Sequence, residues 1–143
     1  MRNWVVKLTT GVVGAAIGAG AIYLSSDAFL YGGREHIDLE SWVEPGDAWT
    51  ERMMPAARWA TAELCGAELP CMQAVQAETL TMYRFDDRED AVAAAREFAG
   101  EAYLSGWIVV RFEPDALTAA ERREFAYSLD CINVGVAEGG LEC

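Results

Sequence analysis

Residues 78–112 read ETLTMYRFDDREDAVAAAREFAGEAYLSGWIVVRF, and this stretch decides the predicted fold. Residues 78–85 alternate between two faces and are rich in β-branched and aromatic side chains, which predicts a strand. Asp86 and Glu89 then form a capping box, which opens an amphipathic helix predicted to run to about Leu104. The stretch therefore begins with a strand that is followed directly by a helix.

A second strand and a second helix follow in the same order. The run WIVVRF at 107–112 is continuously apolar up to its arginine, which predicts a strand buried on both faces. Thr118 and Glu121 repeat the capping box and open a last helix that ends near 133–135. The apolar side of this helix carries Phe125, Leu129 and Ile132. This β-α-β-α order predicts an α+β domain that resembles half of a ferredoxin-like sandwich, with parallel strands joined by a right-handed crossover.

The residues before this stretch predict one more helix. Asp47 is a candidate N-cap for a helix through Leu64, with a break near Met54 because Pro55 deletes one backbone hydrogen bond. Two strands are too few for a stable sheet face, so either residues 72–77, the C-terminal tail or a partner completes the sheet.

One segment resembles part of a known family. Residues 81–98, TMYRFDDREDAVAAAREF, are similar to the opening strand and helix of SPOR domains, which bind peptidoglycan. The second half of that family's pattern is missing from this chain, and the shared residues are those of a general strand and capped helix. The sequence is therefore not assigned to that family.

Composition bounds the class of protein. The chain has 143 residues, 52% of them hydrophobic and 24% charged, which fits one folded domain. Its formal net charge is −12, so binding to the phosphate backbone of nucleic acid is excluded as a function.

The start of the chain predicts a membrane anchor. Residues 8–24, LTTGVVGAAIGAGAIYL, carry no charge, and the flanking Arg2 and Lys7 precede the first acidic residue, Asp27. With the preceding apolar residues the run reaches the roughly 20 residues that cross a bilayer. The positive-inside rule leaves the basic end in the cytoplasm and the acidic body outside it. A cleaved secretory signal and a buried soluble helix are the alternatives.

Three segments follow from this reading: a transmembrane anchor at 1–25, a tether at 26–46 and a small disulfide-stapled α+β domain at 47–143. Small residues form one face of the anchor, a pattern that allows close helix packing in lipid. These helix-packing candidates are Gly11, Gly14, Ala15 and Gly18. The expected partner is a larger integral membrane protein complex or a second copy of the same helix.

The four cysteines of the body predict structural disulfides, since an oxidising compartment is expected outside the cytoplasmic membrane. The local pairing joins Cys65 to Cys71 and Cys131 to Cys143, although four cysteines allow three pairings. The spacing lacks the short thiolate pairs of zinc sites and the C-x-x-C of redox dithiols, so no metal and no cofactor are predicted.

No common catalytic motif occurs in the sequence, which predicts that the protein is not an enzyme. The acidic run at 86–90 is typical of a helix N-terminus, and Arg122 and Arg123 are interpreted as a solvated face. Trp42, Trp49 and Trp59 are candidates either for an interface or for the core of so small a body.

Together these observations predict a single-pass accessory subunit of the cytoplasmic membrane. Its extracytoplasmic domain is expected to pack on a larger membrane protein complex. The alternative is an exported or anchored domain of the cell envelope that binds a glycan or a peptide.

Overall fold

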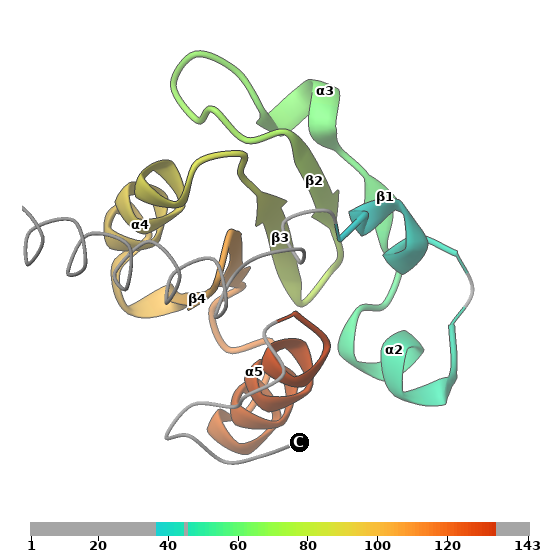
Figure 1. The fold of residues 1–143 in the computed structure, drawn as a ribbon. Coiled ribbons are helices and arrows are strands. Elements are labelled where there is room, and N and C mark those ends of the chain that lie inside the picture. The colour runs from blue at the N-terminus through green and yellow to red at the C-terminus, as the bar shows by residue number, and fades with distance from the viewer. Residues whose placement is uncertain (1–36, 45, 134–143) are drawn as a thin grey trace, which may run out of the picture. The chain divides into compact units, whose positions relative to one another are not determined.

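The computed structural model describes residues 37–44 and 46–133, which form a mixed α and β domain (Figure 1). Within these residues, no helix combines the length and the apolar composition that a membrane span needs. The predicted anchor at 1–25 and most of the predicted tether at 26–46 lie outside the described residues. The last part of the tether, 37–44, packs on the domain, because Leu39 is fully buried in its core.

Five antiparallel strands form the sheet of the described residues, in the order β1-β2-β3-β5-β4. The strands span Arg58–Trp59 (β1), Gln73–Gln76 (β2), Leu80–Arg84 (β3), Ala102–Ser105 (β4) and Ile108–Phe112 (β5). The helices are η1 (Leu39–Trp42), α2 (Ala48–Met53), α3 (Thr61–Leu64), α4 (Arg88–Glu97), η2 (Ala99–Glu101) and α5 (Ala119–Asn133). The α+β class is therefore confirmed, and residues 72–77 do supply a further strand, β2.

The predicted pairing of the two main strands is wrong. β3 and β5 are antiparallel, with Leu80 opposite Phe112, because the helix ends early and one more strand intervenes. α4 stops at Glu97, and residues 102–105, expected at the end of that helix, form β4 instead. A turn through Gly106, whose φ is 56°, folds β5 back between β3 and β4. β3 and β4 thus run in the same direction with β5 between them, which is a split β-α-β unit. Adjacent parallel strands, as the sequence predicts, are not observed.

The segment before β2 also differs from its prediction. Asp47 does cap a helix, since its carboxylate accepts from the backbone N–H of Thr50 at 2.9 Å, and that helix ends at Met53 as the proline predicts. Residues 61–64 are helical as predicted (α3), but the helix does not continue from Pro55 to Ala60, because residues 58–59 pair with β2 as an edge strand. The hydrogen bond from the N–H of Ala60 to the carbonyl of Ala74 stabilises this pairing over a continuous helix.

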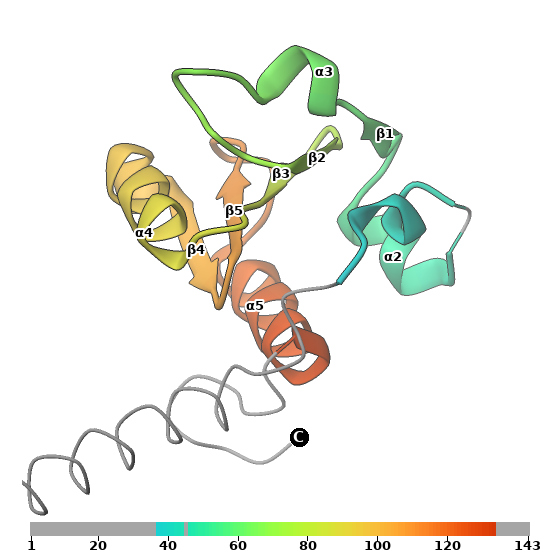
Figure 2. The ribbon, with the colours of Figure 1, turned by 45° about the horizontal axis from the view of Figure 1, so that its top comes forward.

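Helices cover both faces of the sheet (Figures 1 and 2). Alternate residues of the strands pack with α5 and α2 on one face and with α4 on the other. Phe125 of α5 is fully buried at the first face, where the ring of Trp49 stacks on it at 5.8 Å between centroids. β5 is buried on both faces as predicted, with Ile108, Val109 and Val110 at most 1% exposed.

The helix caps follow the sequence closely. Thr118 and Glu121 form the predicted capping box of α5, in which the N–H of Thr118 donates to the Glu121 carboxylate at 2.9 Å. The cap of α4 is Asp87, one residue after the predicted Asp86, and it accepts from the N–H of Glu89. Ile132 was expected on the apolar side of α5 but is 54% exposed.

Candidate functional site

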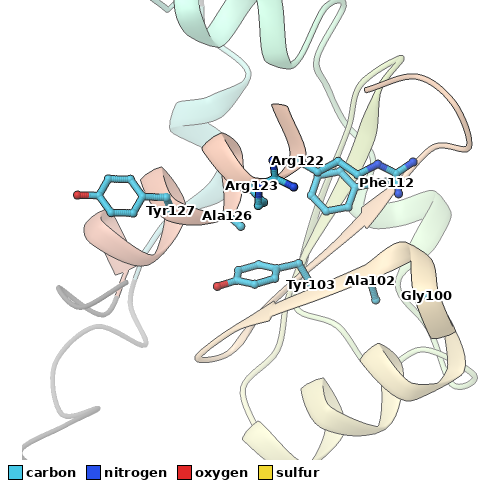
Figure 3. A pocket seen from close by; sticks show the side chains of 8 residues that line it. All are labelled: Gly100, Ala102, Tyr103, Phe112, Arg122, Arg123, Ala126 and Tyr127. Carbon is cyan, nitrogen blue, oxygen red and sulfur yellow. The ribbon is translucent and has the colours of Figure 1, made fainter. Parts of the chain in front are cut away.

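A groove lies between α5 and the β4 end of the sheet, with a volume of about 350 Å³ (Figure 3). We call it the α5–β4 groove. It is lined by Gly100, Ala102, Tyr103, Phe112, Arg122, Arg123, Ala126 and Tyr127. Small residues leave the space, aromatic rings form the walls, and two arginines from α5 reach its rim, which is the composition of a binding site with an apolar floor and a few polar groups.

Arg122 is held in place by several contacts. Its guanidinium lies over the ring of Phe112, 5.2 Å from the centroid, and forms an ion pair with Glu101 at 2.9 Å. The same group donates to the backbone carbonyls of Glu113 and Leu117. A side chain with this many partners is a fixed wall of the groove rather than a free charge.

Arg123 differs from its neighbour. It is exposed, and it makes no ion pair within the part of the chain that the structure describes. Figure 3 shows both arginines on α5, across the groove from Tyr103 and Ala102 of β4. The rim of the groove therefore carries one positive charge, on Arg123, that forms no ion pair with any of the described residues.

Two contacts hold α5 against β4 at the base of the groove. The hydroxyl of Tyr103 donates to the carboxylate of Asp130 at 2.5 Å, and Asp130 is only 5% exposed. Farther along, the side-chain amide of Asn133 donates to the carbonyl of Ser105 at 2.7 Å and to its hydroxyl at 3.1 Å. Asp130 and Asn133 are buried and their side chains are hydrogen-bonded, so the two contacts fix the distance between helix and strand.

The N-terminal end of α5, about one turn before Arg122, is fixed by its cap. Hydrogen bonds from the backbone N–H and then the hydroxyl of Thr118 hold the pKa of Glu121 below its ordinary value. Arg52 of α2 adds to this effect and also contacts Glu124 at 3.1 Å. The groove is thus built on a helix whose N-terminal end is held by both its own cap and a neighbouring helix.

The predicted disulfide between Cys65 and Cys71 is present, with the Cα atoms 5.0 Å apart. It closes the loop between α3 and β2, which packs on the α4 face of the sheet. Cys131 lies on α5, and its predicted partner Cys143 lies outside the described residues, so that pairing stays a prediction. The described residues contain no cluster of three or more potential metal ligands.

The three predicted interface tryptophans occupy two environments. Trp42 and Trp49 are half-buried and pack around Phe125, so they belong partly to the core. The indole N–H of Trp49 also donates to Glu124 at 2.7 Å. Trp59 is 42% exposed on the edge strand β1. The helix-packing candidates lie outside the described residues: Gly11, Gly14, Ala15 and Gly18.

Sequence reasoning missed the α5–β4 groove. It treated Arg122 and Arg123 as one solvated face and placed Tyr103 in a helix. One signal was available, because Asp130 and Asn133 interrupt the apolar face of the last helix at helical spacing. Polar residues at buried helix positions indicate a specific partner.

No known protein family, curated protein or solved structure matches this chain. The function is therefore argued from the geometry of the groove and from the order of charges along the sequence.

Proposed function

We propose that this protein is a single-pass accessory subunit of the cytoplasmic membrane, with its N-terminus inside and its domain outside. The observation that carries the proposal is the α5–β4 groove, a preformed and largely apolar hollow at the end of a sheet. A groove held open by the contacts of Tyr103 and Asn133 is suited to binding a partner without rearrangement.

Two further observations support the location. The order of basic head, apolar run and acidic body is that of an anchor with its head in the cytoplasm. The bond between Cys65 and Cys71 is suited to an oxidising compartment, where structural disulfides persist. In this proposal the anchor and the domain together contact a larger membrane protein complex.

The test is purification of the full chain, tagged at its C-terminus, from its own membranes in mild detergent, with intact mass taken on the eluted protein. The proposal expects a stoichiometric membrane partner and a chain that keeps its apolar segment. The double variant Gly14→Leu, Gly18→Leu should lower recovery of the partner, because bulky side chains separate packed helices. Ala16→Leu, which faces the other side of the predicted helix, is the matched control. A chain that elutes alone and starts near Ile22 contradicts the proposal.

A second function, binding of a cell-envelope glycan, is favoured by another hollow of about 380 Å³ between η1, α2 and α5. Its lining combines Trp42 and Trp49 with the side chains of Ser41, Thr50 and Ser128. Aromatic faces beside hydroxyl groups match the alternating apolar and polar surface of a sugar. Soluble glycan fragments should then quench tryptophan fluorescence of the full chain, and unchanged fluorescence over the whole titration excludes this function.

A further inference from the structure

We infer that the α5–β4 groove binds an extended segment of a partner protein, which adds a strand to β4 and places a carboxylate on Arg123. This inference rests on the proposed function, because it names the partner chemistry of the same groove. It commits to a peptide with an apolar residue and an acidic residue two positions apart.

The first step is that β4 is an unprotected edge. It pairs only with β5 and stands at the end of the five-stranded sheet of the described residues. Its sequence, Ala-Tyr-Leu-Ser at 102–105, contains no charge and no proline, the devices that usually prevent pairing at an edge. In an antiparallel strand alternate residues direct their N–H and C=O groups outward, so β4 offers backbone partners to an added strand.

The opposite edge of the sheet shows the contrast. β1 has two residues, and its Arg58 is fixed by two hydrogen bonds of 2.8 Å to Glu63. A short, charged edge of this kind resists pairing with another chain. Among the described residues the two edges of the sheet therefore differ, and the edge at the groove lacks the protections seen at β1.

The second step is that every second side chain of an added strand would point into the groove. Tyr103 and Ser105 of β4 point toward α5, so an adjacent strand also directs every second side chain toward that helix. The space above Phe112 and beside Ala126 accepts an apolar side chain. The next side chain on the same face lies about 7 Å away, two residues along an extended chain.

The third step is charge. Arg122 is already paired with Glu101, whereas Arg123 on the rim lacks an ion-pair partner among residues 37–44 and 46–133. A carboxylate is the natural partner of a guanidinium, which donates two parallel hydrogen bonds to it. The groove is therefore complementary to one acidic side chain beside one apolar side chain, not to a long acidic run.

The experiment selects a random octapeptide display library on the full chain held in nanodiscs. The expected peptides carry an apolar residue followed two positions later by Asp or Glu. Arg123→Glu should weaken the best synthetic peptide about ten-fold or more in fluorescence anisotropy, and should select Lys or Arg at the acidic position. Arg96→Glu is the matched control, because Arg96 is an exposed arginine on α4 at the opposite face and its replacement should leave affinity unchanged.

Backbone pairing is tested separately, without changing the protein. N-methylation of the peptide at one set of alternate residues should abolish binding, and at the other set should leave it intact, as strand addition requires. Selection of no acidic peptide, or equal affinity for Arg123→Glu, overturns the inference. Binding that appears only after residues 134–143 are removed assigns the groove to the chain's own tail and overturns it too. A partner that still co-purifies in any of these cases leaves the proposed function standing.

Discussion

Removal of the disulfide between Cys65 and Cys71 should cost about 2 kcal/mol of unfolding free energy. The bond joins residues six apart, and in the chain-entropy model a loop of this size restricts the unfolded state by about that amount. Alanine at both positions avoids burial of new polar groups, since both cysteines pack against the α4 face of the sheet. For a domain of this size, the loss corresponds to a fall in Tm on the order of 10 °C.

The measurement is thermal unfolding of the full chain followed by near-UV circular dichroism, which reports the tryptophans packed around Phe125. Glu68→Ala is the control, because it changes an exposed residue of the same loop and should shift stability by less than about 0.5 kcal/mol. An unchanged Tm in the variant without the disulfide would refute the entropy argument. It would mean that local contacts, such as the bond from the N–H of Gly66 to the carbonyl of Leu69, already restrain this loop in the unfolded chain.

Three further predictions concern the core and the helix caps. Phe125→Ala should lower the unfolding free energy by about 3–5 kcal/mol in urea titrations, because the ring is fully buried among other aromatics, whereas Ile132→Ala at an exposed position should change it by less than about 0.5 kcal/mol. Thr118→Ala should cost about 1 kcal/mol in the same assay through loss of the α5 cap. Hydrogen bonds from neighbouring backbone N–H groups lower the pKa of both Asp47 and Glu121, so their contribution is complete above the ordinary pKa values of 3.8 and 4.5 and is lost as pH falls through the lower folded values. Unfolding free energy should therefore fall with pH below about 4.5, and equal stability at pH 6 and pH 3 would contradict this assignment.

Local signals in the sequence were sufficient for much of the fold. The alternation at 78–85, the capping residues Asp47 and Thr118, and the apolar run at 107–112 each correspond to an observed element. These patterns depend on neighbours within a few positions, so one sequence carries them in full. The disulfide was equally local, because Cys65 and Cys71 lie close together along the chain.

The secondary structure of residues 99–105 could not be predicted from neighbouring residues alone. These residues continue the apolar arc of the preceding helix, so helical periodicity extends the helix too far. In the structure Ala99 has a positive φ of 51°, which ends the helical path, and Tyr103 pairs with Val110 of β5 instead. Pairing with a strand that follows later in the chain overrode the propensity of the segment. The formation of β4 makes β5 antiparallel to β3 and places β4 at the edge of the sheet, so an error over residues 102–105 changes both predictions.

The α5–β4 groove could not be predicted from the sequence either, because contacts between distant residues form it. Arg122 and Arg123 are adjacent in sequence, but they point about 100° apart on a helix and so meet different surroundings. Arg122 reaches Glu101, 21 residues earlier, while Tyr103 reaches Asp130, 27 residues later. These pairs join residues of different elements that lie far apart in the sequence, and no spacing rule within a single element reveals them.

The charge of the whole chain limits how the groove can acquire an acidic partner. A net charge of −12 repels acidic segments at a distance, so attraction by Arg123 acts only within about a Debye length, roughly 8 Å at physiological salt. Affinity must then come from backbone pairing along β4 and from the apolar floor, and a single short strand supplies little of it after the loss of translational freedom. A membrane anchor offsets that loss, because two proteins held in one bilayer meet at a high effective concentration. Under the proposed function, the anchor at 1–25 therefore compensates for the modest affinity of the groove, because it would keep the groove beside its partner in the membrane.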